Sequence, residues 1–182
     1  MEPPTGLWTT WTARYRRIRQ RVWARRGIDL AVLAALVFGL GAWQTRAHLS
    51  SGETPAAVLT TLAGERVSID SLRGKPVLLA FWAPWCSVCA AESQNLSWAK
   101  RVVGDRARVV SIAASFENLA QVRDYVRDHG VDYPVLLGDD ALLQAFHVEA
   151  FPTVYFLDAH GRVQRSATGY TTTLGLLARL LL

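Results

Sequence analysis

Runs of apolar residues bounded by turn-forming residues mark the secondary structure of the chain from about residue 58 onward. Residues 76–82 form an unbroken apolar run of strand length, and residues 107–114 form a second, largely apolar run. Such runs are typical of strands that are buried on both faces of a sheet. Residues 118–129 have an amphipathic pattern that ends at Gly130 and predicts a helix, with an apolar face made of Leu119, Val122, Tyr125 and Val126.

The other elements follow in a regular order. The segment after the first strand, residues 86–100, has a helical composition. Turn residues then separate an extended segment at 133–137, a short helix at 141–146, a hairpin formed by 151–157 and 162–168, and a closing helix at 171–182. A β-α-β unit followed by a hairpin and a helix predicts an α/β domain with a central mixed sheet flanked by helices.

Charge and hydropathy separate the first 57 residues from this domain. Residues 1–26 contain seven arginines and a single acid, so this arm is the source of the chain's net charge of +5. An apolar run follows it, and an arginine-rich arm before such a run is a signal that retains the arm in the cytoplasm. We therefore expect a cytoplasmic arm at 1–26, a transmembrane anchor at 27–45, a linker at 46–57 and a folded domain at 58–182.

The apolar run is short for a spanning helix, so a cleaved signal peptide is the alternative to an anchor. The uncharged residues 30–45 would span about 24 Å as a helix, against a bilayer core of about 30 Å. The residues after Trp43 offer no Ala-x-Ala cleavage site, which favours the anchor. The folded domain itself is close to neutral, so the sequence gives no indication of a nucleic-acid-binding face.

Both cysteines of the chain lie in one short motif, FWAPWCSVC, at residues 81–89. A bridge between Cys86 and Cys89 would close so small a loop that it would constrain the unfolded chain little. A zinc site would need two further ligands from histidines that are at least 38 residues away. The pattern therefore favours a redox-active disulfide over a structural bridge, a metal site or two ordinary core cysteines.

The position of Cys86 predicts how the two sulfurs divide the reaction. Pro84 ends the strand, and Cys86 falls where the helix begins. Unpaired N–H groups and the positive end of the helix dipole favour a thiolate there. Cys89 lies one turn further along and would be more shielded. We therefore expect Cys86 to attack and Cys89 to resolve the mixed disulfide.

The longer string LRGKPVLLAFWAPWCSVCAAE, residues 72–92, resembles the active-site segment of the thioredoxin superfamily. It is similar to the membrane-anchored extracytoplasmic branch of that superfamily, the TlpA/ResA/CcmG-like and ScsD-like thiol–disulfide oxidoreductases. This resemblance implies a thioredoxin fold and a protein-disulfide oxidoreductase without a cofactor. It also implies a catalytic role for Glu92, which matches the acidic position of the branch's WCxxCxxE pattern.

One departure adds weight to Glu92. Cytoplasmic thioredoxins carry a buried aspartate just before the Phe-Trp pair, and this chain has Ala80 there. Glu92 lies three residues after Cys89, on the same face of the helix, where a carboxylate could relay a proton. An exposed helical glutamate without a catalytic role is the alternative interpretation.

The resemblance also assigns a substrate-binding surface. Phe151 and Pro152 are similar to the cis-proline loop that faces the cysteines in thioredoxin folds, and the backbone of Phe151 would pair with an extended substrate segment. We expect Trp85 to be a partly exposed indole that shields Cys86. Tyr133 and His147 are expected to be core or surface side chains outside the site.

Three functions are compatible with these features. The first is a membrane-tethered reductant of disulfides in extracytoplasmic proteins, re-reduced by a membrane electron donor of the DsbD/CcdA kind. The second is an oxidant of the same fold, and the third is a module that binds Cu(I) or an apocytochrome without turnover. The resemblance favours the first. We expect a monomer held in the inner membrane by a single span, with its domain on the periplasmic side.

Overall fold

The computed structural model describes residue 52 and residues 54–181. The expected arm, the anchor and most of the linker lie outside these residues, so the fold below concerns the C-terminal domain alone. Within the described part of the chain, no helix is both long and apolar enough to cross a bilayer.

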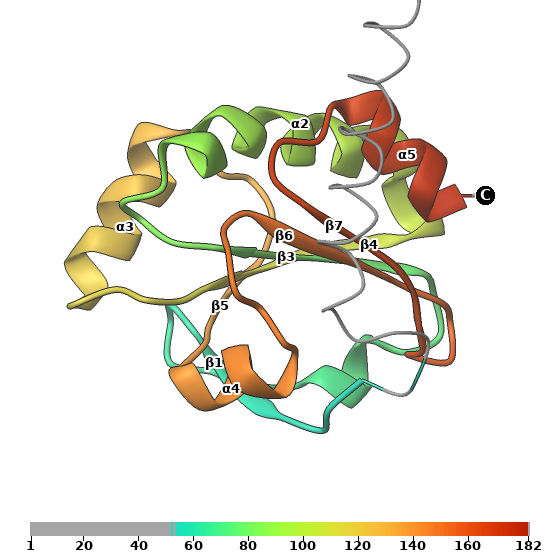
Figure 1. Cartoon of the computed structure of the whole chain (residues 1–182), viewed down its shortest axis with the longest axis horizontal. Helices are drawn as coiled ribbons and strands as arrows, with labels where there is room; N and C mark the ends of the chain where they lie inside the picture. Colours follow the sequence, from blue (N-terminus) through green and yellow to red (C-terminus); the bar gives the residue numbers. More distant parts are fainter. Residues whose placement is uncertain (1–51, 53, 182) are drawn as a thin grey trace, which may run out of the picture. The chain divides into compact units, whose positions relative to one another are not determined.

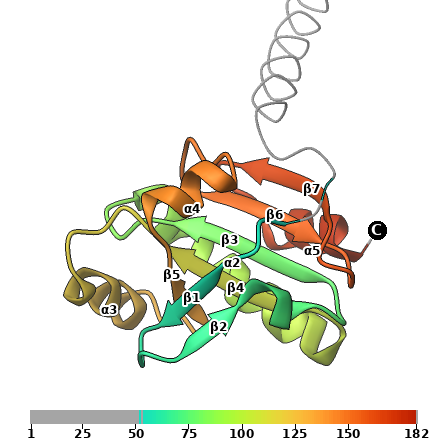
Figure 2. The same cartoon turned by 90° about the horizontal axis from the view of Figure 1, so that it is seen from below.

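The centre of the domain is a mixed sheet with the strand order β2-β1-β5-β4-β3-β6-β7 (Figures 1 and 2). Its strands are β1 (Val58–Thr61), β2 (Arg66–Ser68), β3 (Val77–Trp82), β4 (Arg108–Ala113), β5 (Val135–Leu137), β6 (Thr153–Leu157) and β7 (Val163–Thr168). Strand β3 lies between the parallel β4 and the antiparallel β6. The residues that follow β3 are thus placed near the middle of the sheet.

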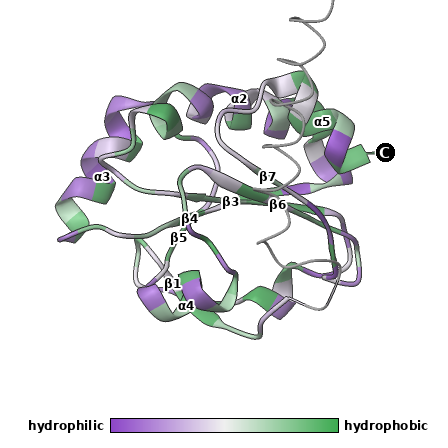
Figure 3. Ribbon diagram, viewed as in Figure 1, coloured by the Kyte–Doolittle hydropathy of each residue, from purple (hydrophilic) through white to green (hydrophobic). Residues whose placement is uncertain are grey.

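Helices cover both faces of this sheet (Figure 1). They are α2 (Ser87–Val103), α3 (Leu119–Asp128), α4 (Asp140–Ala145) and α5 (Thr173–Leu181), with short 3₁₀ turns at η1 (Ile69–Leu72) and η2 (Gly104–Arg106). Helices α2 and α5 lie together on one face, and α4 lies on the other (Figure 1). Helix α5 is mainly hydrophobic, whereas α3 mixes hydrophilic and hydrophobic residues (Figure 3).

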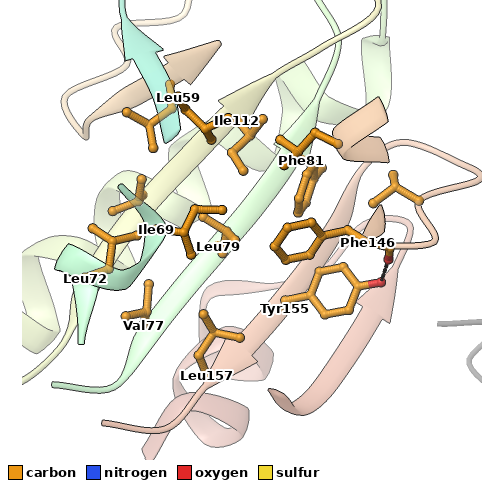
Figure 4. Close-up of a cluster of buried hydrophobic side chains, with 14 of the residues drawn as sticks. Leu59, Ile69, Leu72, Val77, Leu79, Phe81, Ile112, Phe146, Tyr155 and Leu157 are labelled. Carbon is orange, nitrogen blue, oxygen red and sulfur yellow. Dashed lines mark hydrogen bonds between the residues drawn. The ribbon is translucent and has the colours of Figure 1, made fainter. Parts of the chain in front are cut away.

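The alternation of side chains along β3 fixes which residues face which layer, as expected for a strand buried on both faces. Leu78 and Ala80 pack in the cluster formed with α2 and α5. Leu79 and Phe81 point to the opposite cluster, where Phe81 packs on Tyr155 and on Phe146 after α4 (Figure 4). The hydroxyl of Tyr155 donates a hydrogen bond to the carbonyl of Phe146 (Figure 4). The buried tyrosine is thereby accommodated without an unpaired hydroxyl.

The elements expected from the sequence are present, with differences of one or two residues at most boundaries. Two differences are larger. The hairpin of β1 and β2, with Gly64 in its turn at φ +87°, was not expected from the pattern. Leu119, expected on the apolar face of α3, is 39% exposed because it is the first residue of that helix, and Val122 and Tyr125 are the residues buried there.

Candidate active site

The two cysteines lie at the junction between β3 and α2, as the sequence predicts. They form a disulfide with their Cα atoms 5.2 Å apart. Cys86 is the N-cap residue of α2, and its sulfur accepts a hydrogen bond of 3.1 Å from the backbone N–H of Cys89. Cys86 is 7% exposed and Cys89 3% exposed, so Cys89 is the more shielded residue.

The surroundings of Cys86 favour negative charge on its sulfur. The first turn of α2 contains no acidic residue, and the free N–H groups of that turn lie beside the N-cap. In the reduced protein these N–H groups and the helix dipole would stabilise a Cys86 thiolate. The arrangement therefore favours Cys86, the more accessible of the two cysteines, as the nucleophile.

The cis-proline loop lies where the resemblance placed it. The peptide bond between Phe151 and Pro152 is cis, as expected. The side chain of Phe151 packs against the cluster that contains both cysteines. The carbonyl of Pro152 accepts a hydrogen bond of 2.8 Å from the N–H of Gly169, so the loop is tied to the segment after β7.

Trp85 forms the exposed rim beside the disulfide. Trp85 is 68% exposed, so it is more exposed than the partly exposed indole expected from the sequence. Its ring packs edge to face on Phe151, with 5.8 Å between the ring centroids. The indole N–H donates a hydrogen bond of 2.8 Å to the carbonyl of Ser115, a residue held at φ +51°. One polar contact therefore fixes the indole while its ring stays available for contact with a substrate.

Glu92 is buried, and the interpretation of Glu92 as an exposed helical residue is wrong. Its side chain is only 1% exposed, and its Oε1 accepts a hydrogen bond of 2.8 Å from the N–H of Thr171. Burial raises the pKa of Glu92 to about 7, although the bond from Thr171 acts in the opposite direction. A carboxyl that titrates near neutral pH can accept and return a proton under ordinary conditions.

Two tyrosines share the environment of Glu92. Burial raises the pKa of Tyr125 and of Tyr133, and the charge of Glu92 adds to both shifts. The ring of Tyr125 stacks on Trp82 with centroids 4.0 Å apart, in the cluster that holds the cysteines. Both phenols therefore stay protonated near neutral pH, and Glu92 is the group of this set that titrates there.

Tyr133 and His147 were expected to be core or surface side chains, and the structure gives one of each, although the charge of Glu92 reaches Tyr133. Tyr133 is buried in the core, and His147 is exposed. His147 lines a hollow of about 470 Å³ beside α4 together with Asp140, Gln144 and Glu149. In the part of the chain that the structure describes, no three His, Cys, Asp or Glu side chains gather as they would around a metal ion.

Sequence reasoning missed the residues that hold Glu92. Thr171 was expected to start the closing helix, whereas α5 begins at Thr173 and Thr171 belongs to the preceding loop. Asn95, whose side chain donates a hydrogen bond to the carbonyl of Thr171, was predicted only to lie in a helix. Their partners lie more than 70 residues away along the chain, and no local pattern could have revealed these contacts.

A disulfide at a helix N-cap, with a cis-proline loop packed against its cluster through Phe151, on a mixed α/β sheet, defines a thioredoxin-like thiol–disulfide oxidoreductase. The chain belongs to the AhpC/TSA family, whose model matches residues 52–166. Within the thioredoxin superfamily its relatives match the TlpA/ResA/CcmG-like branch.

The relatives agree with this class. The chain is 28% identical over 159 residues to the thiol-disulfide oxidoreductase ResA of Bacillus subtilis, covering 85% of this chain and 88% of that protein. It is 30% identical over 122 residues to the thioredoxin-like protein YneN of the same organism, covering 66% of this chain and 72% of that protein.

A solved structure agrees as well. A secreted Mycobacterium tuberculosis disulfide oxidoreductase homologous to E. coli DsbE has a TM-score of 0.60 and 27% identity. The match covers 68% of this chain and 93% of that one, so the solved protein consists of little besides this domain. Since residues 54–181 also contain the whole sheet and its three hydrophobic clusters, the domain is a folding unit on its own.

Proposed function

We propose that the protein is a membrane-tethered extracytoplasmic oxidoreductase that reduces protein disulfides. The observation that carries this proposal is the buried Glu92, with a pKa of about 7, one helical turn after Cys89 and in the same helix as the N-cap Cys86. This combination offers a thiolate for attack and a separate carboxyl for proton transfer.

The first step uses Cys86. Its thiolate attacks one sulfur of a substrate disulfide, forms a mixed disulfide with it and releases the other substrate sulfur as a thiolate, which takes a proton from water. The substrate would lie extended along the cis-proline loop, where the backbone of Phe151 pairs with it as with an added strand. Trp85 would cover one side of the reacting sulfurs.

The second step uses Cys89 and Glu92. The Cys89 thiol gives its proton to the Glu92 carboxylate and attacks the sulfur of Cys86, which breaks the mixed disulfide. The substrate leaves as a second thiolate and is protonated, and the Cys86–Cys89 disulfide remains. The substrate thus gains two electrons, and the protein has lost two.

The same carboxylate supports the reducing direction. Strong oxidants of this fold have a stabilised reduced form, because their attacking thiolate is strongly favoured. A buried carboxylate beside Cys89 disfavours a nearby thiolate and so destabilises the reduced form. A dithiol that loses electrons readily then needs its own supply, for which we propose a membrane electron donor of the DsbD/CcdA kind.

The N-terminal residues support the tethering. The arginine-rich arm and the apolar run at 27–45 are the pattern of an uncleaved anchor with the arm inside the cytoplasm. We propose that the domain acts as a monomer on the outer side of the inner membrane. Its substrates would be extracytoplasmic proteins that contain disulfides.

A turnover assay with cysteine variants tests this function. The domain from residue 47 onward should reduce insulin disulfides in the presence of a dithiol, and Cys86→Ser should abolish that reduction. Cys89→Ser should accumulate a mixed disulfide with the substrate, because the resolving thiol is absent. Faster alkylation of Cys89 than of Cys86 in the reduced protein would contradict these roles.

A redox titration against glutathione tests the direction. We expect a potential closer to the value of about −270 mV that is typical of thioredoxin than to the value of about −120 mV of the oxidant DsbA. A value near the second figure would support the oxidant instead.

A further inference from the structure

The segment between β7 and α5, residues 169–172, touches both halves of the active site. We call it the β7–α5 loop. At its start, the N–H of Gly169 donates to the carbonyl of Pro152, in the cis-proline loop, at 2.8 Å. Two residues later, the N–H of Thr171 donates to the carboxyl of Glu92, on α2, at 2.8 Å. The position of this loop therefore decides whether Glu92 keeps its hydrogen-bond donor.

Asn95 fixes that position from α2. Its side chain lies one turn after Glu92 on the same side of the helix, and it is half-buried. The Nδ2 of Asn95 donates a hydrogen bond of 3.0 Å to the carbonyl of Thr171. Its Oδ1 accepts one of 3.1 Å from the hydroxyl of Thr173, at the start of α5. Thr171 is thus bonded to α2 through both its N–H and its carbonyl.

We propose that Asn95 is a positioning residue for Glu92, whose side-chain amide holds the backbone of Thr171 so that its N–H points at the buried carboxyl. The proposal rests on the proton-transfer role given to Glu92 above, but the geometry can be tested without turnover. An amide suits this task because it donates and accepts at once without adding a charge beside Glu92.

The other groups around Glu92 cannot replace this contact. The two cysteines come from its own helix, and Tyr125 and Tyr133 come from α3 and from the segment before β5. Tyr125 hydrogen-bonds with Ser93, whereas Thr171 hydrogen-bonds with Glu92 through its backbone and its side chain. The backbone and side-chain hydrogen bonds from Thr171 both lower the pKa of Glu92 against the effect of burial, so displacing Thr171 should raise that pKa.

The test measures the pKa of Glu92 directly in the oxidised domain. The carbon-13 signal of the Glu92 carboxyl is followed against pH in the wild type and in Asn95→Ala, with the disulfide intact so that no thiol titrates. We expect the pKa to rise by about half a unit to one unit in Asn95→Ala. Hydrogen exchange at the Thr171 amide should also become faster, because its carbonyl is no longer held.

The neighbouring residue provides a matched control. Gln94 is also an amide on α2, and its Nε2 donates to the carbonyl of His129 at 2.8 Å, on the side of α3. Gln94→Ala therefore removes a similar bond from the same helix but leaves the β7–α5 loop untouched. It should change neither the pKa of Glu92 nor the exchange of the Thr171 amide.

An unchanged pKa in Asn95→Ala, or an equal shift in Gln94→Ala, would overturn the proposal. If Asn95→Ala does not fold, Asn95→Ser decides in its place, with the same two outcomes. These results do not depend on the proposed function, because the pKa of Glu92 is measured without turnover. Whether Glu92 takes part in turnover is tested separately, with Glu92→Gln. The pH profile of insulin reduction should shift upward in Asn95→Ala only if both proposals hold.

Discussion

Glu92 shows how one residue acquires its chemistry from burial. An exposed glutamate titrates near 4.5, whereas Glu92 has a pKa of about 7 because its carboxyl is desolvated. The hydrogen bonds that it accepts from Thr171 lower this pKa, but not enough to restore the ordinary value. The residue is therefore able to exchange protons near neutral pH.

Glu92→Gln tests the influence of this charge on the cysteines. The substitution preserves the shape of the side chain and removes the carboxylate that disfavours a nearby thiolate. The thiol pKa values of the reduced domain should therefore fall, as measured from alkylation rates against pH. Because the two thiols and the carboxyl titrate as a coupled set, the fitted values belong to the set.

The same variant should lose activity. Without a carboxylate to accept the proton of Cys89, insulin reduction at neutral pH should fall about tenfold or more. Glu65→Gln, which removes a carboxylate from an exposed turn, should leave both measurements unchanged. Unaltered thiol pKa values and unaltered turnover in Glu92→Gln would remove Glu92 from the mechanism.

Burial of Glu92 also makes stability depend on pH. Because its pKa is raised in the folded domain, its favourable contribution is complete below the unfolded value of 4.5 and is lost as the pH rises through about 7. The oxidised Glu92→Gln domain should therefore be more stable than the wild type at pH 8, by up to about 3 kcal/mol. The gap should close toward pH 5, as measured by urea unfolding, and a gap that does not vary with pH would contradict the raised pKa.

At the scale of elements, the junction after β3 determines the site. The strand is buried on both faces and delivers the chain to the start of α2, where Cys86 becomes the N-cap. The helix then places Cys89, Glu92 and Asn95 at successive turns. Strand β3 and helix α2 thus supply both sulfurs and the carboxyl, and the hairpin of β6 and β7 supplies the cis-proline loop and the start of the β7–α5 loop.

Gly138 limits the packing between β5 and α4. A Cβ atom at this position would lie 2.6 Å from Cγ2 of Ile112 and 3.0 Å from Cδ2 of Leu142. Gly138→Ala should therefore lower the free energy of unfolding by about 1–3 kcal/mol, as measured by urea unfolding. At Gly175 the nearest atoms to an added Cβ are side-chain atoms of Arg179 on α5 and of Thr171 and Thr172 in the β7–α5 loop, all at 3.1 Å or more. Gly175→Ala should therefore change the free energy of unfolding by less than about 1 kcal/mol in either direction. Equal effects of the two variants would contradict the tight contact at Gly138.

At the scale of the whole molecule, we propose that the N-terminal segment decides on which side of the membrane the domain works. A reporter that is active only outside the cytoplasm, fused after residue 182, should give signal, and washed membranes should retain the full-length chain. The physical reason is the arginine-rich arm, which resists transfer across the membrane. Replacing the arginines of residues 14–26 with glutamine should reduce the signal. A soluble product that starts near residue 47 would support a cleaved signal peptide instead.

The sequence by itself determined most of the secondary-structure elements and the position of the two cysteines. The apolar run of β3, the break at Pro84 and the helical residues after it are local patterns, so they place Cys86 at a helix N-terminus without knowledge of the fold. The cis bond at Pro152 was anticipated from resemblance, since an isolated X–Pro bond is usually trans. The β1–β2 hairpin was missed because its strands are only four and three residues long.

Only the tertiary structure decided the state of Glu92. The sequence is compatible with either a buried or an exposed Glu92 carboxylate. Helical spacing gives the face of the helix on which a residue lies, but not what packs on that face. The β7–α5 loop covers it, through Thr171, which is 79 residues further along the chain. Such a contact depends on strand order and on the packing of α5 against α2, which arise from the whole core together. The burial that sets the pKa of Glu92, and the bonds through which Asn95 holds its donor, follow from that packing.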